Sequence, residues 1–159
     1  DWRRLASRLA MPVAGLVLLL AYLQAATGFL PLGSAPLSRL LGVGMKRVAS
    51  ELGAQERQTG ARLVLASDYE TTAWLRFYAP GLSLVAVDQP GRYMEAPLQE
   101  VQGPALYVSD RSPDARLLKN FKTARRLADL VREREGRPIG RFSVWFVAMP
   151  QSRIQGRRP

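Results

Sequence analysis

The feature that most constrains this chain is a long stretch without any charged residue, Leu9–Ser38. Within it, Met11–Leu30 is almost wholly apolar, and about 20 apolar helical residues are enough to cross the ~30 Å hydrocarbon core of a membrane. Pro12 suits the first turn of such a helix, and Gly28 with Pro31 suits its end. The sequence therefore predicts one transmembrane helix at about residues 11–30.

The charges on either side of this stretch predict its orientation. Arg3, Arg4 and Arg8 come directly before it, whereas the first charge after it is Arg39. Because cytoplasmic flanks carry the excess of Lys and Arg, we expect the N-terminus in the cytoplasm and the rest of the chain outside. Two alternatives remain open at this point. One is a cleaved signal peptide ending near Ala26–Gly28, and the other is a buried core helix.

Composition narrows the possible functions. The net charge of +10 is typical of proteins with anionic partners, such as nucleic acid, lipid head groups or phosphorylated ligands, although scattered arginines also fit a generally basic surface. An extracytoplasmic location argues against nucleic acid. The sequence has no Cys and no His, which excludes disulfides, thiol nucleophiles, Ser-His-Asp triads and the usual zinc sites within it.

After a connector that ends at residue 36, residues 37–150 predict one small α/β domain, and residues 151–159 a basic, disordered tail. Strand, helix and strand follow one another over residues 62–87, which is a βαβ unit with parallel strands. We therefore expect a three-layer domain with a short, mostly parallel sheet. The expected elements are helices at 37–58, 69–78 and 112–120, strands at 62–66, 82–87, 105–109 and 140–149, and a loop at 89–104. Residues 123–135 fit either a helix or the first arm of a hairpin.

Aspartates follow all three strands that are expected to be parallel. They are Asp68, Asp88 and Asp110, and Arg111 comes directly after the last. Ligands bind beyond the carboxyl ends of strands in open parallel sheets, so these side chains can converge there and hold a divalent metal or sugar hydroxyls. The alternative is that each Asp caps a turn or helix. At the first of these sites, Ser67 as N-cap would form a capping box with the glutamate three residues later.

Other candidates lie in the following helix and in the loop. Trp74, Phe77 and Tyr78 have the helical spacing of core residues, although a stacking platform is an alternative. Long loops in small domains are often functional, which makes Arg92 and Tyr93 candidates for ligand contacts. No P-loop, oxyanion-hole motif or dinucleotide fingerprint is present in the sequence. The residues by themselves therefore predict no catalytic centre.

The segment Ser67–Gly81 resembles a motif of bacterial family-39-type glycosyltransferases, in their C-terminal periplasmic domain. These multi-pass membrane enzymes are related to the aminoarabinose transferase of lipid A modification and to the protein mannosyltransferases of protein glycosylation. Their motif is Asp-Tyr-x-Thr-Ala followed by aromatic-Tyr-x-Pro-Gly. The residues that match it here are Asp68, Tyr69, Thr71, Phe77, Tyr78, Pro80 and Gly81, whereas Thr72 stands where Ala is usual.

The order of the other segments is also similar to that family. A Pro-Leu connector at Pro31–Leu32 precedes a helix that opens near Leu41–Gly42, and Gly103–Ser109 is similar to the family's Gly-x-Ala-Leu-Tyr-Val strand. The segment Gly91–Glu95 departs from the Gln-Phe-Asp-Leu-Trp-like loop usual at its place. The family usually ends in a hairpin, so the resemblance favours a hairpin over residues 123–149.

The resemblance implies that the parent protein transfers a sugar from a polyprenyl-phosphate donor to a lipid or protein acceptor at the outer face of the bacterial inner membrane. The family's catalytic acidic residues lie in N-terminal loops that this sequence does not contain, so no catalytic residue, metal or cofactor is expected here, although the parent can use a divalent metal. The expected partners are the lipid bilayer, the remaining transmembrane helices, the donor, and a glycan or lipid acceptor. Asp68, Tyr69 and Arg76 become the leading candidates for acceptor binding. The alternative is a single-pass, membrane-anchored binding or assembly module of the cell envelope without enzymatic activity.

Overall fold

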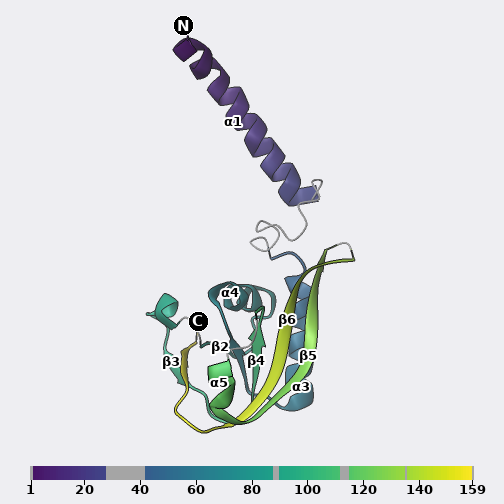
Figure 1. The fold of residues 1–159 in the computed structure, drawn as a ribbon, viewed down its shortest axis with the longest axis vertical. Coiled ribbons are helices and arrows are strands. Elements are labelled where there is room, and N and C mark those ends of the chain that lie inside the picture. Colours follow the sequence, from purple (N-terminus) through teal and green to yellow (C-terminus); the bar gives the residue numbers. More distant parts are fainter. Residues whose placement is uncertain (1, 28–41, 88–89, 112–114, 135, 159) are drawn as a thin grey trace. The chain divides into compact units, whose positions relative to one another are not determined.

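The computed structural model describes residues 2–27, 42–87, 90–111, 115–134 and 136–158. The chain forms two compact units, Asp1–Leu41 and Gly42–Pro159. The first contains a single described helix, and the second contains the sheet with its covering helices (Figure 1).

The helix of the first unit is α1, at Trp2–Thr27. Its described apolar side chains between Leu9 and Leu23 are exposed on every side of the helix. Among the described residues, however, no helix is long and apolar enough to cross a membrane. The transmembrane helix predicted for Met11–Leu30 is therefore not found. That prediction also included Gly28–Leu30, which lie outside the described residues.

The second unit contains a seven-stranded sheet in the order β3-β7-β2-β1-β4-β6-β5. The strands are β1 Leu63–Ala66, β2 Leu84–Ala86, β3 Leu98–Glu100, β4 Ala105–Ser109, β5 Phe121–Arg134, β6 Arg137–Pro150 and β7 Gln155–Arg157. The α/β class and the three parallel strands are confirmed, because β1 pairs in parallel with both β2 and β4. The prediction of a short, mostly parallel sheet is wrong, since the β2–β7, β3–β7, β4–β6 and β5–β6 pairings are antiparallel.

Helices cover both faces of this sheet (Figure 1). They are α3 Met45–Thr59, α4 Tyr69–Tyr78 and α5 Ala115–Lys119, together with the 3-10 turn η1 Pro90–Tyr93. Alternate residues of the central strands separate the two cores: Val64 and Leu106 face α3 and α4, whereas Leu65 and Tyr107 belong to the core that α5 borders. This alternation follows from the period-2 geometry of a strand with both faces buried.

Residues 123–135, which the sequence alone left open between helix and strand, belong to a hairpin. Strands β5 and β6 pair over their whole length, and Gly136 has a φ of 74° at the turn. The hairpin favoured by the resemblance is therefore confirmed. Its outer strand, β5, forms one edge of the sheet, and four of its charged residues are exposed there: Lys122, Arg125, Arg126 and Asp129.

The predicted disordered tail is also wrong. Strand β7 lies between β3 and β2, and Ile154, directly before it, is buried in the core of the α5 face. Gly156 fits closely against β2: a Cβ added there would lie 2.6 Å from the Ala86 carbonyl oxygen and would also meet Val85. The segment Gln155–Arg157, which has no apolar pattern, is thus held in place by two strands that are distant from it in the sequence.

Residues 37–41 of the helix predicted at 37–58 lie outside the described residues, and the described part of that prediction forms α3 at Met45–Thr59. Gly42 and Gly44 have φ values of 61° and 79°, a left-handed conformation that favours glycine, so α3 begins only at Met45. The short helix predicted at 112–120 is found as α5, and the helix predicted at 69–78 is α4 with the same bounds.

Candidate functional site

The first turn of α4 is fixed by Asp68. Its carboxylate accepts hydrogen bonds from the Thr71 backbone N–H at 2.8 Å, from the Thr71 hydroxyl at 2.6 Å and from the Ser67 hydroxyl at 3.1 Å. Asp68 is therefore the N-cap, and the predicted capping box with Ser67 as the cap is wrong. A carboxylate at a helix N-terminus accepts hydrogen bonds from backbone N–H groups that have no partner within the helix. Its negative charge also interacts favourably with the positive end of the helix dipole.

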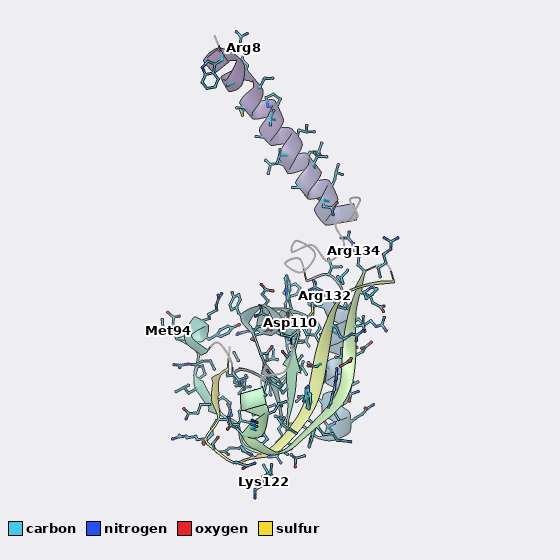
Figure 2. All side chains as sticks on the ribbon, in the orientation of Figure 1. Arg8, Met94, Asp110, Lys122, Arg132 and Arg134 are labelled. Atoms are coloured by element: carbon cyan, nitrogen blue, oxygen red, sulfur yellow. The ribbon has the colours of Figure 1, made fainter. Side chains whose placement is uncertain are left out.

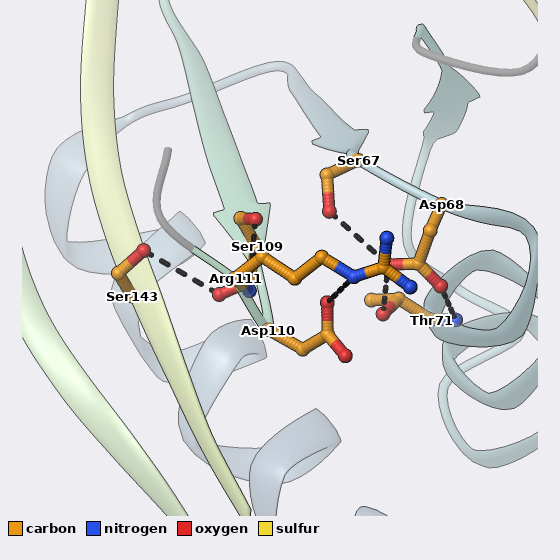
Figure 3. Close-up of polar contacts among 7 residues, drawn as sticks. All are labelled: Ser67, Asp68, Thr71, Ser109, Asp110, Arg111 and Ser143. Atoms are coloured by element: carbon orange, nitrogen blue, oxygen red, sulfur yellow. Dashed lines mark hydrogen bonds and ion pairs between the residues drawn. The ribbon is translucent and has the colours of Figure 1, made fainter. Parts of the chain in front are cut away.

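Figure 3 shows how the ends of β1 and β4 meet. Because these strands are parallel, Asp68 and Asp110 lie at the same edge of the sheet, as the sequence predicts. The Arg111 side chain reaches from the end of β4 toward Ser67 and Asp68, and its Nε lies 3.7 Å from Asp110 Oδ1. The alternative that Asp68 acts as a cap is thus observed, and its oxygens are occupied by hydrogen bonds within the chain.

A metal site at this edge finds no support in the described part of the chain. Within it, no group of three acidic side chains lies close enough to hold a metal ion. Asp88, the third aspartate of the predicted cluster, lies outside the described residues. Asp110 and Arg111 form an exposed ion pair of adjacent residues, which in water contributes little to binding or stability.

The other four predicted residues, Tyr69, Arg76, Arg92 and Tyr93, lie together on α4 and η1. The rings of Tyr69 and Tyr93 stack with 5.6 Å between their centroids, and the Arg92 guanidinium carbon lies 5.3 Å from the Tyr69 ring centroid. The Tyr93 hydroxyl donates a 3.5 Å hydrogen bond to the Tyr69 carbonyl oxygen. Two aromatic side chains and one cation therefore join η1 to the first turn of α4.

Tyr93 is held as a neutral phenol. Partial burial raises its pKa above the usual value of 10.0, and the nearby Tyr69 and Asp68 act in the same direction. Thr72 and Arg76 act against this rise, by a hydrogen bond and by positive charge. The phenol therefore remains a hydrogen-bond donor throughout the physiological pH range.

Two adjoining hollows open beside this contact. The first has a volume of about 710 Å³ and is lined by residues of α4, η1, the segment after η1 and the end of the chain, which are Arg76, Arg92, Tyr93, Met94, Glu95, Ala96, Pro97 and Arg158. The second, of about 490 Å³, is lined by Tyr69, Thr72, Ala73, Arg76, Phe77 and Tyr93. We call them the arginine hollow and the aromatic hollow, and Arg76 and Tyr93 line both.

The sequence favoured core positions for Trp74, Phe77 and Tyr78 and kept a stacking platform as the alternative. Trp74 and Tyr78 do pack against the core, but 73% of Phe77 is exposed, because α4 buries the face of Thr71, Thr72 and Leu75. Sequence reasoning did not single out Met94 or Arg158. Met94 is 75% exposed and lies at the outer edge of the domain beside η1 (Figure 2). Arg158 lies in the segment that was expected to be disordered. Spacing on α4 could have identified Phe77, but nothing in the sequence indicates Arg158.

No family model, curated protein or solved structure matches this chain.

Proposed function

We propose that this chain is the non-catalytic, extracytoplasmic C-terminal part of a multi-pass membrane glycosyltransferase. The parent enzyme moves a sugar from a polyprenyl-phosphate donor to a lipid or protein acceptor, and this part contacts the acceptor. The observation that carries the proposal is the Ser67–Gly81 segment. Its resemblance to the glycosyltransferase motif coincides with a continuous unit, the Asp68 cap followed by the whole of α4, and its Tyr69 and Phe77 line the aromatic hollow.

The first helix gives further support. Between Leu9 and Leu23, α1 exposes apolar side chains in every direction, and helices of that kind are normally surrounded by lipid or by other apolar helices. The proposal assigns α1 to an environment made by lipid and by the remaining helices of the parent enzyme. Arg8, exposed before the apolar stretch, then lies on the cytoplasmic side.

The decisive test is the coding sequence upstream of Asp1. The proposal requires further apolar spans there and acidic residues in the first extracytoplasmic loop. An upstream region that encodes neither would overturn it.

A second test is a fusion of alkaline phosphatase after Pro159 in the full-length protein, in a bacterial host. This enzyme is active only outside the cytoplasm, so we expect activity in whole cells, whereas a fusion before Trp2 should be inactive. The reverse pattern would contradict the proposed orientation.

One observation favours a second candidate function, a binding module of the cell envelope without transferase activity. Three arginines and an exposed aromatic ring line the adjoining arginine and aromatic hollows, and such a set of side chains suits binding without catalysis. The same upstream sequence separates the two functions, because the binding module predicts one apolar helix and no acidic loop.

A further inference from the structure

Three arginines from distant parts of the sequence converge on the arginine hollow. Arg76 lies on α4, Arg92 lies on η1, and Arg158 directly follows β7. None of them forms an ion pair with another described residue, and Glu95 is the one described carboxylate among the lining residues. The hollow therefore carries an excess of positive charge that the described part of the chain does not neutralise.

The Arg92 side chain and the backbone around the hollow are held in place by contacts within the chain. Arg92 lies over the Tyr69 ring, and the stack of Tyr69 with Tyr93 fixes η1 against α4. At the end of the chain, the Arg157 side chain donates a 2.8 Å hydrogen bond to the Ala96 carbonyl oxygen, and the Arg158 backbone N–H donates a 3.1 Å hydrogen bond to the Pro97 carbonyl oxygen. These contacts place the backbone on both sides of the hollow before any ligand arrives, which lowers the entropy cost of binding.

The adjoining aromatic hollow supplies a different chemistry. Tyr69, Phe77 and Tyr93 line it, and the Phe77 ring is largely exposed to solvent. An exposed aromatic ring beside a hydroxyl-bearing side chain suits the apolar face of a sugar ring, whose edge carries hydroxyl groups. Guanidinium groups, in contrast, suit phosphate oxygens, which accept their paired N–H donors.

We propose that the two hollows together bind a phosphorylated sugar. The phosphate, as a monoester or a diester, lies among Arg76, Arg92 and Arg158, and the sugar ring lies against Phe77. Arg76 stands at the junction and contacts both parts of the ligand. The inference deepens the proposed function, on which it rests for the place of this ligand in a transferase, by naming the ligand class of the acceptor-binding part.

Isothermal titration of the full chain, in a mild non-ionic detergent because α1 exposes apolar side chains, tests this inference. Glucose 1-phosphate should bind more tightly than inorganic phosphate, and methyl glucoside should bind weakest. Arg92→Gln or Arg158→Gln should each weaken the binding of glucose 1-phosphate about tenfold, since each substitution removes a charge-assisted hydrogen bond to the phosphate. Phe77→Ala should lower the affinity for glucose 1-phosphate several-fold but leave the affinity for inorganic phosphate unchanged.

Arg137→Gln is the matched control, because Arg137 is exposed at the start of β6 and lines neither hollow. It should leave every affinity unchanged. The inference is wrong if the unmodified chain binds none of the phosphorylated probes, or if methyl glucoside binds as tightly as glucose 1-phosphate. It is equally wrong if Arg137→Gln has the effect of Arg92→Gln, or if an oligo(dT) strand binds more tightly than glucose 1-phosphate.

The source of the sugar phosphate is tested with phosphatidylcholine vesicles that carry phosphatidylglucose, compared with vesicles of phosphatidylcholine alone. The ligand is lipid-linked if the chain binds the phosphatidylglucose vesicles more tightly than free glucose 1-phosphate and if Arg92→Gln abolishes this preference. Binding of glucose 1-phosphate without any preference for these vesicles assigns a soluble one. These measurements need no transferase activity, so a negative result leaves the test by upstream sequence and fusion unaffected.

Discussion

Three arginines near the two edges of the sheet make different contacts: Arg132 on the hairpin edge, and Arg76 and Arg92 near the β3 edge. At the hairpin side, Arg132 of β5 is only 5% exposed, and its side chain donates a hydrogen bond to the Val43 carbonyl oxygen just before α3. Near the β3 edge, Arg76 and Arg92 are exposed and form no ion pair with any described residue. Figure 2 shows Arg132 and Met94, the neighbour of η1, on these opposite sides.

The hairpin side is further joined by surface charges. Arg47 of α3 forms a 2.6 Å ion pair with Glu133 of β5 and a 2.8 Å pair with Glu51 one turn later. A Cβ added to Gly44 would lie 2.5 Å from the Glu133 carbonyl oxygen, so the start of α3 packs closely on β5. Arg47 and Arg132 thus join α3 to the hairpin, whereas Arg76 and Arg92, which form no ion pair with a described residue, are among the arginines that we propose bind a ligand.

The largest expected effect is on the buried arginine. Arg132→Ala removes a donor from a buried site and leaves a cavity and an unpaired carbonyl group, so the free energy of unfolding should fall by about 3 kcal/mol. Urea denaturation of the full chain in detergent, followed by tryptophan fluorescence, measures it.

Arg92→Ala is the counterpart on the other side and should cost about 0.5 kcal/mol or less, because it removes only an exposed cation–π contact. Equal losses in the two variants would show that both sides use arginine structurally, and the comparison would fail.

A second prediction tests whether β7 holds the arginine hollow together. Gly156→Ala places a Cβ against Val85 and the Ala86 carbonyl oxygen, so β7 must shift, and the free energy of unfolding should fall by about 2 kcal/mol. The matched control is Gly81→Ala, where a Cβ would meet nothing within 4 Å. Thermal unfolding followed by circular dichroism compares them, and equal midpoints would contradict the tight packing of β7.

The central part of the fold could be predicted because its signals are local. The apolar run before Ser67, the cap, and the Pro80–Gly81 stop each lie within a few residues of the element that they define, and β1, α4 and β2 appear where expected. The parallel order then brings Asp68 and Asp110 to one edge. Sequence reasoning could thus place the residues at this edge before the structure was known.

The rest depends on partners that are distant in the sequence. Strand β5 carries apolar residues at helical spacing, and only its pairing with β6 decides its conformation. Strand β7 has one buried apolar neighbour, Ile154, and pairs with β3 more than fifty residues earlier. The arginine hollow was unpredictable for the same reason, because Arg158 reaches it only through β7.

A third prediction concerns the cap that orients α4 and therefore Arg76. Asp68→Ala removes the acceptor for the Thr71 N–H and should lower the free energy of unfolding by about 1 kcal/mol. Asp68→Asn should retain most of it, because an amide oxygen still caps. Ser67→Ala is the control and should cost less, since Asp68 caps the helix. If Ser67→Ala costs as much as Asp68→Ala, the Ser67 hydroxyl carries as much of the cap as the Asp68 carboxylate.

The smallest expected effect is the titration of Tyr93, which joins η1 to α4. Its pKa is raised in the fold, chiefly by burial, so the protonated phenol is favoured in the native state. The stability that this shift contributes is therefore fully present below pH 10.0, the usual tyrosine value, and is lost as the pH rises through the folded pKa. Absorbance at the tyrosinate band should show one tyrosine that ionises at a higher pH than usual. This component should be absent in Tyr93→Phe, and in urea its pKa should return to the usual range. A titration curve unchanged by Tyr93→Phe would mean that η1 does not bury this ring against α4, and that the arginine side of the sheet is looser than the comparison requires.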